Sequence, residues 1–458
     1  MPGDGLKIGI IGAGWYGAHI GFALAKAGHE VIIFEKNADI FSQISGKFGI
    51  RLHLGPHYPR SEETRKHCRK GFDKFKATYP ELLVPHLYSI YALGISDANK
   101  EPSTINFDHF KRVCEESPTC REIDTAAFGY QNLIGAFTLD EPSLAIGERL
   151  RETFRRYLRN AKIDVRCNYT VQKIERQGSQ TMISNGDSTE AFEIVINATS
   201  YQSFFPKDTD FPFDLDVVYQ PCLALVYKDS KPGDKPISMI VMDGWFPCLM
   251  PYQEHEHEDG KYDNTYIMTH GKWTIMGSYS TPQEANVVFE KLDDDFVERS
   301  IKKLAEEEMR RFWPAFNERF TYIGWKGTVL AKLKTKKEFR GAITFEKEGV
   351  IHVFPGKINN IFDAEEEVKS LLSNHKIRKL NGYNYVTDGV LDVSMHEISE
   401  KPEPNEKNTC TLQTYQELES DVQQPIQSHA KNQASFWYNR SAPPPKDKRF
   451  VHKTNTFV

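Results

Sequence analysis

The N-terminal part of the chain carries the clearest pattern of apolar and polar positions. Residues 8–11 form a short β-branched run, which is typical of a buried strand. Apolar residues then recur at helical spacing between residues 20 and 27, and Gly28 follows at a place where helices commonly end in glycine. A second apolar run covers residues 31–34. The pattern therefore predicts a compact strand–helix–strand unit whose two strands are buried.

The middle of the chain alternates between loop-like and strand-like composition. Residues 41–60 are crowded with polar and ring side chains, and they predict a loop. Short strands are predicted from residue 164 to residue 196, with a turn at Asn185-Gly186. Residues 237–279 alternate apolar and polar positions and are rich in Trp, Tyr and Met, which favours several strands of one sheet.

Two helices and a tail are predicted in the last third of the chain. Residues 293–316 have amphipathic helical spacing, and a second helix is predicted from 363 to 372. Beyond residue 376 the core pattern decays, and the segments 401–407 and 442–448 have the composition of linkers. We therefore predict an extended or partly disordered tail over residues 376–458. Its aromatic island, Phe436-Trp437-Tyr438, is a candidate for docking on the body or on a partner.

Three glycines follow the first predicted strand, at Gly12, Gly14 and Gly17, and Glu35 ends the second strand. In such a unit the first glycine permits a tight turn, the second lets the backbone approach a pyrophosphate, and the third lets the helix pack on the strands. The helix N-terminus offers unpaired N–H groups to the phosphates. A carboxylate at Glu35 suits a ribose 2′-OH and disfavours a 2′-phosphate. The motif therefore predicts a dinucleotide site and argues against NADP.

The rest of the chain favours FAD over NAD. NAD dehydrogenases usually continue the first unit with more alternating strands and helices, whereas a loop follows here. Four segments together resemble the D-amino-acid-oxidase-like superfamily of FAD oxidoreductases: GAGWYG with its acid, SGKFGIRLHLGPHYPRS, VINAT and VFPGKINNIFDAEEEV. The resemblance implies an α/β fold in which a Rossmann-type FAD-binding domain carries an inserted substrate domain with a mixed β-sheet. The expected FAD-binding domain comprises residues 1–75, 150–204 and 327–375, and the substrate domain comprises 76–149 and 205–326.

The resemblance also implies which residues contact FAD. The glycine turn would hold the pyrophosphate, the acid at the end of the second strand would flank the ribose, and the loop of residues 45–53 would lie along the ribityl chain and flavin ring. The turn at residues 356–358 would cap the pyrimidine end, where a lysine or an N–H group stabilises the negative charge of a reduced flavin. A solvated lysine at a helix start is the alternative there. The expected contacts are Gly12, Ala13, Gly14, Trp15, Tyr16, Gly17, Glu35, Lys36, Ser45, Gly46, Arg51, Leu52, His53, Val171, Ala198, Thr199, Gly356, Lys357 and Ile358.

Candidates for catalysis and substrate binding are fewer. His53 and His57 have the spacing of helical metal ligands, but the Gly-Pro pair between them is incompatible with a helix. A loop lying against the flavin is favoured, with structural hydrogen bonding as the alternative, and no metal site is expected. Arg51 and Arg60 are candidates for a phosphate or a substrate carboxylate, or form structural ion pairs. Arg340 is a candidate clamp for a substrate carboxylate, and no residue is identified as the catalytic base.

Other features of the middle region have a structural and a functional interpretation. The stretch HEHED at 255–259 is metal-like in composition, but a solvated hairpin loop is the favoured interpretation. The resemblance implies that residues of the 237–279 region roof the flavin and bind substrate, and an ordinary sheet core is the alternative. These residues are Trp245, Phe246, Met250, Tyr252, Tyr266, Met268, His270, Trp273 and Tyr279.

Composition narrows the class of protein. The net charge of -5 over 458 residues gives no basic field for nucleic acid. Seven scattered cysteines, none in a Cys-x-x-Cys pair, favour free thiols in a reducing compartment. No segment is apolar enough to span a membrane, and no signal peptide is recognised. A cytoplasmic protein with a small-molecule substrate is therefore expected.

The sequence predicts an FAD-dependent oxidoreductase that oxidises an amine or amino-acid-like small molecule by hydride transfer to flavin N5. Three alternatives remain: a flavin monooxygenase or hydroxylase, a non-redox flavoprotein, and an NAD dehydrogenase. A separate NAD(P)H domain is not expected because no second GxGxxG exists. The late FAD segment contains no cysteine, so a covalent link to the flavin through cysteine is not expected either.

Overall fold

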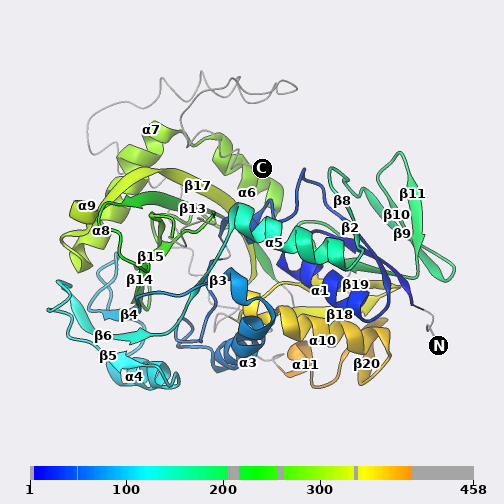
Figure 1. Ribbon diagram of the computed structural model, residues 1–458, viewed down its shortest axis with the longest axis horizontal. Coiled ribbons are helices and arrows are strands. Elements are labelled where there is room, and N and C mark those ends of the chain that lie inside the picture. The colour runs from blue at the N-terminus through cyan, green and yellow to red at the C-terminus, as the bar shows by residue number, and fades with distance from the viewer. Residues whose placement is uncertain are drawn as a thin grey trace.

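Two large β-sheets form the frame of the protein in the computed structural model (Figure 1). The structure describes residues 5–48, 50–204, 206, 216–255, 262–334 and 339–393. The sheet built around the N-terminal strand lies on the right of Figure 1, and the second sheet lies on the left. We call them the nucleotide sheet and the roof sheet.

The nucleotide sheet has eight strands in the order β20-β21-β18-β19-β12-β1-β2-β8. Five strands, from β19 to β8, run parallel, and the other three join antiparallel at one edge. The predicted strand–helix–strand unit is confirmed at its centre. The strands are β1 (Lys7–Ile11), β2 (Glu30–Phe34), β8 (Asp164–Arg166), β12 (Ile194–Asn197), β18 (Ile343–Lys347), β19 (Val350–Phe354), β20 (Ile377–Leu380) and β21 (Tyr383–Val386).

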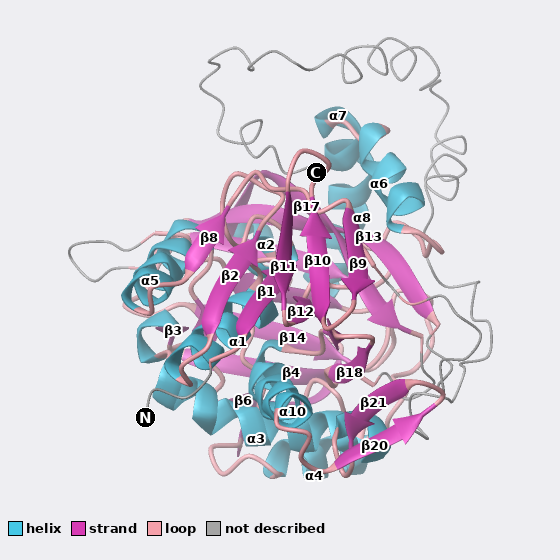
Figure 2. Ribbon diagram, turned by 90° about the vertical axis from the view of Figure 1, so that its right-hand side faces the viewer, coloured by secondary structure: helices cyan, strands magenta, loops and turns pink. Residues whose placement is uncertain are grey.

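Both faces of the nucleotide sheet are covered. On one face lies α1 (Trp15–Lys26), which contacts α5 (Gly147–Asn160) and α10 (Ile361–Leu372). On the other face lies the small sheet of β9 (Lys173–Gln177), β10 (Gln180–Ser184) and β11 (Thr189–Phe192) (Figure 2). This sheet approaches so closely that a Cβ on Gly9 would lie 2.8 Å from the Ile183 side chain. The predicted short strands, and the turn between β10 and β11, are confirmed.

The roof sheet also has eight strands, in the order β17-β13-β16-β15-β14-β4-β6-β5. Only the β14–β4 pair among these strands is parallel, so the predicted mixed sheet is confirmed. Its longest pair is β13 with β17. The strands are β4 (Tyr88–Gly94), β5 (Arg121–Glu122), β6 (Leu133–Leu139), β13 (Val217–Asp229), β14 (Ile237–Met242), β15 (Pro247–Pro251), β16 (Thr265–His270) and β17 (Phe320–Leu333).

Helices cover the roof sheet around the largest apolar core. This core includes Phe312 and Phe316, both fully buried. The predicted helix at 293–316 is broken into α7 (Asp294–Phe296), a π-helical turn (Val297–Lys302), α8 (Lys303–Phe312) and α9 (Phe316–Arg319). Pro314 accounts for the last break, because proline cannot continue a helix. The other helices here are α6 (Pro282–Glu290) and α4 (Phe107–Glu115).

The elements joining the two sheets bear on the expected domain boundaries. After β2 the chain forms α2 (Ile44–Lys47), α3 (Glu62–Thr78), a 3-10 turn (Pro80–Leu82) and β3 (Leu83–Val84), which pairs with β7 (Ser143–Leu144). Apart from α2, the described part of the 41–60 stretch is loop, as predicted. The expected boundary at residue 327 falls inside β17, which belongs to the roof sheet along its whole length.

The predicted start of the tail at residue 376 is wrong. Strands β20 and β21 form a hairpin at the edge of the nucleotide sheet, and α11 (Val390–Val393) follows. Asn381-Gly382 makes the turn with both residues at positive φ, which is a common two-residue hairpin turn. Tyr383 and Tyr385 are buried and give the short strands an apolar anchor. The rest of the expected tail, including Phe436-Trp437-Tyr438, lies outside the described residues.

Two smaller expectations concern the stretch between β15 and β16 and the length of the helices. The stretch 255–259 follows β15 and precedes β16, which pair antiparallel as a hairpin requires, although residues 256–259 lie outside the described residues. In the described part of the chain, none of the helices has the length and apolar character needed to cross a lipid bilayer.

Candidate functional site

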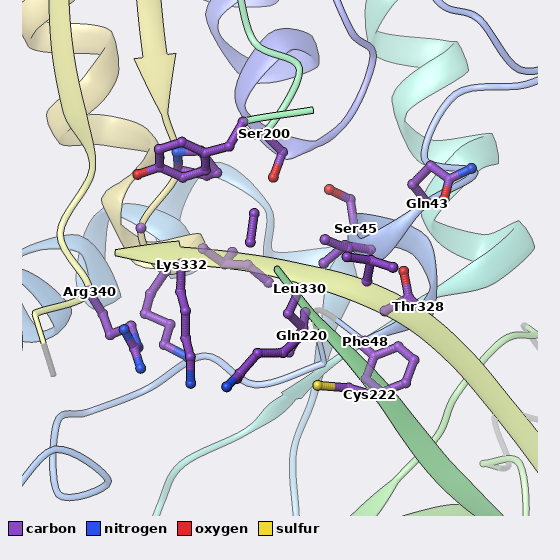
Figure 3. Close-up of a pocket in the computed structure, with 18 of the residues that line it drawn as sticks. Gln43, Ser45, Phe48, Ser200, Gln220, Cys222, Thr328, Leu330, Lys332 and Arg340 are labelled. Carbon is purple, nitrogen blue, oxygen red and sulfur yellow. The ribbon is translucent and has the colours of Figure 1, made fainter. Parts of the chain in front are cut away.

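A large cavity of about 1030 Å³ lies between the nucleotide sheet and the roof sheet. At one end it is lined by Gly12, Gly14 and Glu35 of the nucleotide sheet. At the other end it is lined by residues of β13 and β17, several of which are drawn in Figure 3. The cavity therefore joins the predicted dinucleotide site to the predicted substrate sheet.

The glycine turn is shaped for close approach. Gly12 has a φ of +100°, and a Cβ there would lie 2.7 Å from the Ala198 carbonyl oxygen. A Cβ on Gly17 would lie 1.9 Å from the Gly12 oxygen, so only glycine lets α1 pack on the turn. Helix α1 begins after Gly14, which has no capping side chain, and its first turn carries no acid. The Trp15 N–H donates to Ser45 Oγ at 3.2 Å, and a helix N-terminus at a cavity wall suits a pyrophosphate.

Glu35 stands at the end of β2, as predicted, and is buried. Its Oε2 accepts a hydrogen bond from the Ala13 N–H at 2.9 Å, and its Oε1 accepts one from the Asn37 N–H at 2.9 Å. The carboxylate therefore fixes the backbone of the glycine turn through its hydrogen bond with the Ala13 N–H. It also lines the cavity, together with Lys36 and Val171.

Four of the nineteen expected contacts do not line the cavity. Ala13 and Gly17 belong to the glycine turn but do not line the cavity, and Leu52 is fully buried in the apolar core. A Cβ on Gly46 would lie 1.8 Å from the Phe41 oxygen, so this glycine serves the fold of the loop. The fifteen that line the cavity are Gly12, Gly14, Trp15, Tyr16, Glu35, Lys36, Ser45, Arg51, His53, Val171, Ala198, Thr199, Gly356, Lys357 and Ile358.

Tyr16 joins the glycine turn to the late turn at 355–357. Its hydroxyl accepts a hydrogen bond from the Gly356 N–H at 2.9 Å and donates one to the Lys357 carbonyl at 2.7 Å. The Lys357 N–H donates to the Arg340 carbonyl at 3.0 Å. The N–H groups of Gly356 and Lys357 are thus already used within the protein. The Lys357 ammonium lies 5.0 Å from the centre of the Tyr58 ring.

His53 and His57 come together as stacked rings on the cavity wall, with centroids 5.1 Å apart. Burial holds the pKa of both imidazoles well below the usual value, and the nearby Arg51 lowers it further. Both rings are therefore neutral at neutral pH and are poor proton acceptors. Arg51 donates to His57 Nδ1 at 3.0 Å and to the Cys248 sulfur at 2.7 Å.

The other two arginines differ in their partners. Arg60 forms a salt bridge with Asp243 at 3.0 Å, which matches the structural alternative for this residue. Arg340 donates to the carbonyl oxygens of Phe339 and Leu333, at 3.2 and 3.5 Å, and lines the cavity. Of these two, Arg340 thus remains the candidate for binding a substrate anion.

The roof sheet adds residues that the sequence did not single out. Gln220 and Cys222 of β13 pair with Leu330 and Thr328 of β17, so these four share one face of the sheet. Lys332 follows two residues later on that face. Figure 3 shows Gln220, Lys332 and Arg340 extending their nitrogen atoms toward the same space. The signal for these residues was their spacing of two along two long strands, which places alternate side chains on one face.

Some aromatic and polar residues of the roof sheet line the cavity, and others belong to the ordinary core of the sheet. Trp245, Phe246, Met250 and His270 line the cavity. The others pack elsewhere, and Tyr252, for example, accepts a hydrogen bond from the buried Lys326 at 3.0 Å. The residues of this set that do not line the cavity are Tyr252, Tyr266, Met268, Trp273 and Tyr279.

The site fits FAD and offers no metal-binding cluster in the described ranges. The glycine turn, the N-terminus of α1 and the cavity beside Glu35 suit the ADP half of the cofactor. The remaining length of the cavity, past Ser45 to the late turn, suits the flavin half. Among the described residues, no group of three or more His, Cys, Asp or Glu side chains is arranged to hold a metal ion.

Comparison with known proteins gives the family. The model of the FAD-dependent oxidoreductase family (DAO) matches residues 7–355. The FAD-dependent monooxygenase kojA of Aspergillus flavus is 47% identical over 421 residues, which cover 90% of this chain and 98% of the relative. An FAD-dependent monooxygenase of Fusarium mangiferae is 28% identical over 371 residues, which cover 80% of this chain and 91% of the relative.

Solved structures share the fold. Glycine oxidase from Geobacillus kaustophilus has a TM-score of 0.59 at 15% identity, covering 81% of this chain and 95% of the oxidase. L-proline dehydrogenase from P. horikoshii has a TM-score of 0.59 at 14% identity, covering 81% of this chain and 94% of the dehydrogenase. The sequence match, the fold and the cavity lead to one conclusion: the chain belongs to the DAO family of FAD-dependent oxidoreductases.

Proposed function

We propose that this FAD-dependent oxidoreductase oxidises a small amine or amino-acid-like molecule that carries an acidic group. The observation behind the proposal is the convergence of Gln220, Lys332 and Arg340 on one wall of the cavity. They come from two strands and the segment after β17, and each ends in nitrogen donors; Gln220 Nε2 donates one of its two N–H groups to Ser278 Oγ at 2.8 Å. A guanidinium binds a carboxylate through two parallel hydrogen bonds.

Apolar residues beside these donors supply the other half of the proposed substrate pocket. Leu330 and Cys222 lie on the same face of the roof sheet as Gln220, Phe48 also lines the cavity, and burial raises the pKa of the Cys222 thiol to about 12. This thiol is therefore neutral and packs as a small apolar group. A substrate would lie with its acidic group at the donors and its oxidisable carbon toward the flavin. Bound FAD supplies the two-electron acceptor for that carbon.

We also propose how the chain is divided between cofactor and substrate. The nucleotide sheet with α1, α5 and α10 would form the FAD-binding domain, and the roof sheet with its helices would form the substrate domain. The fifteen expected contacts that line the cavity would hold FAD. This division keeps β17 whole and assigns the β20–β21 hairpin to the FAD-binding domain.

The test is an anaerobic bleaching screen of the flavin-loaded protein against amino acids, other amines and hydroxy acids. We expect bleaching by a compound with both an amine and an acidic group, and no bleaching by its ester. The proposal fails if hydroxy acids or uncharged alcohols bleach the flavin and no amine does.

A second candidate function is monooxygenation. The observation in its favour is the name of the relative that is 47% identical over 90% of this chain. The two functions differ in the fate of dioxygen. A monooxygenase transfers one atom of labelled dioxygen to its product, whereas an oxidase or dehydrogenase leaves the product free of label. Mass spectrometry of the product therefore decides between them.

A further inference from the structure

The two stacked histidines of the cavity wall differ in what surrounds their Nδ1 atoms. Both rings are neutral, so each carries a single proton that sits on either Nδ1 or Nε2. The hydrogen-bond partner of one ring nitrogen decides which nitrogen holds the proton. In His57 the Nδ1 atom meets a guanidinium, whereas in His53 it meets a carboxylate. Opposite partners imply opposite tautomers.

His57 is the simpler case. The Arg51 Nη1 lies 3.0 Å from His57 Nδ1, and a guanidinium can only donate. His57 Nδ1 must therefore accept, and in a neutral ring the proton sits on Nε2. This tautomer leaves an N–H donor on the nitrogen that Arg51 does not occupy.

His53 is held in the other form by Glu141. His53 Nδ1 is buried, lies 3.7 Å from Glu141 Oε1, and has no hydrogen-bond partner among the described residues. Glu141 is itself buried and fixed, because it accepts hydrogen bonds from the Tyr91 hydroxyl at 2.5 Å and the Leu54 N–H at 2.8 Å. Burial raises the pKa of the Glu141 carboxyl, but Arg51 and these two donors, one on each oxygen, favour its ionised form. A lone pair on His53 Nδ1 would face this carboxylate and be repelled, whereas an N–H is attracted.

We infer that Glu141 is a positioning residue of the cavity, which keeps the proton of His53 on Nδ1 and turns a lone pair on Nε2 toward the ligand. Beside it, His57 offers an N–H. The wall thus presents one acceptor and one donor on rings 5.1 Å apart. This pair fits a ligand that carries an N–H or O–H donor next to a carbonyl or carboxylate acceptor.

The inference deepens the proposed function, because the cavity it describes is the one assigned to flavin and substrate. Glu141 does not line this cavity itself but approaches His53 from the segment after β6 of the roof sheet. The same segment also forms a backbone hydrogen bond with the loop that carries the two histidines, since the Leu144 N–H donates to the Ile50 carbonyl at 2.9 Å. A residue that follows a roof-sheet strand therefore decides which nitrogen of His53 carries the proton, although His53 lies on the loop after β2 of the nucleotide sheet.

Nitrogen-15 spectra of histidine-labelled protein, with and without FAD, test the inference. The two rings are assigned by the loss of their signals in H53Q and H57Q. In the wild-type protein we expect His53 to show the Nδ1–H pattern and His57 the Nε2–H pattern. In E141Q we expect the Nδ1–H pattern of His53 to be lost or mixed, while His57 is unchanged.

The matched control is E306Q. Glu306 is also buried and also accepts a hydrogen bond from a tyrosine, Tyr227, at 3.0 Å, but its charged partner is Arg310 and not a histidine of the cavity wall. E306Q should leave the His53 pattern as it is. Should E141Q fail to fold, Y91F removes a donor from Glu141 without removing its charge, and the Nδ1–H pattern should persist.

The inference is overturned if wild-type His53 carries its proton on Nε2, or if E141Q folds and leaves the Nδ1–H pattern of His53 intact. Neither result depends on any substrate. A failed bleaching screen would therefore count against the proposed function alone.

Discussion

The nucleotide sheet and the roof sheet build their halves of the cavity from different parts of the chain. On the nucleotide sheet the critical features are glycines and backbone groups, such as the turn at Gly12 and the start of α1. On the roof sheet they are side chains on one face of β13 and β17, such as Gln220 and Lys332. The first half is suited to a cofactor of fixed shape, and the second half can change its specificity by single side-chain replacements.

The comparison predicts that backbone changes on the nucleotide sheet act on the cofactor and that side-chain changes on the roof sheet act on the substrate. The comparison fails if a backbone change on the nucleotide sheet affects only substrate binding, or if a side-chain change on the roof sheet affects only cofactor binding.

The largest effect is expected from G17A. The new Cβ would lie 1.9 Å from the Gly12 oxygen, so α1 must move away from the turn, at a cost of about 3 kcal/mol or more. We expect loss of bound flavin and a lower melting temperature, measured by absorbance and calorimetry. G28A is the control: Gly28 has a positive φ, unlike the helical Gly17, but nothing lies near its Cβ position. That variant should lose about 1–2 kcal/mol and keep its flavin.

Next comes E35A, which removes the carboxylate behind the glycine turn. The N–H groups of Ala13 and Asn37 lose a charged acceptor, which is worth about 1.5–3 kcal/mol. We expect FAD to bind roughly 10- to 100-fold more weakly in a fluorescence titration. Substrate specificity in the bleaching screen should not change. Unchanged FAD affinity in a folded E35A protein would contradict the assignment of this end of the cavity.

R340Q tests the substrate half. Loss of the guanidinium should raise the substrate concentration for half-maximal bleaching by roughly 10-fold or more, because a charged hydrogen bond to the acidic group is lost. FAD affinity should stay within about 2-fold, since such a change is below 0.5 kcal/mol. R378Q, at an exposed arginine paired with Asp392, is the control and should change neither quantity. Equal weakening of FAD and substrate binding by R340Q would break the comparison.

The smallest effect on the cavity is expected from E367Q. Burial raises the pKa of the Glu367 carboxyl from 4.5 to about 7, and its Oε1 accepts a hydrogen bond from the Val390 N–H. A raised pKa in the folded state means that the carboxyl favours folding below pH 4.5 and that this contribution is lost as the pH rises through 7. E367Q should therefore be more stable than the wild type above pH 7, by about 2–3 kcal/mol.

The same pair of proteins supplies the control for this prediction. Near pH 4.5 the wild-type carboxyl is neutral in the folded protein, so the two melting temperatures should converge. FAD affinity should be equal at both pH values. A wild-type protein that is more stable than E367Q at pH 8 would contradict the expected direction.

The two sheets also differ in how well the sequence predicted them. The strand–helix–strand unit was predictable because its signals are local: an apolar run, three glycines at fixed spacing and Glu35 at the strand end. The β20–β21 hairpin was missed although Asn381-Gly382 is a strong turn signal, because its strands are only four residues long.

The roof-sheet residues could not be predicted as a group, because their proximity depends on pairing between distant strands. Gln220 and Leu330 are 110 positions apart and become neighbours only through the β13–β17 register. Glu141 was missed for the same reason, since nothing in the local sequence connects it to His53. Residues that act through long-range pairing carry no local spacing rule, unlike those of the glycine turn.

The flavin content of the purified protein tests the central claim most directly. The account predicts a protein with the visible absorbance of a flavin that releases FAD on denaturation, with up to one FAD per chain after reconstitution. The G17A variant, prepared in the same way, should contain none. A folded wild-type protein that is colourless and takes up no FAD on reconstitution would contradict the account.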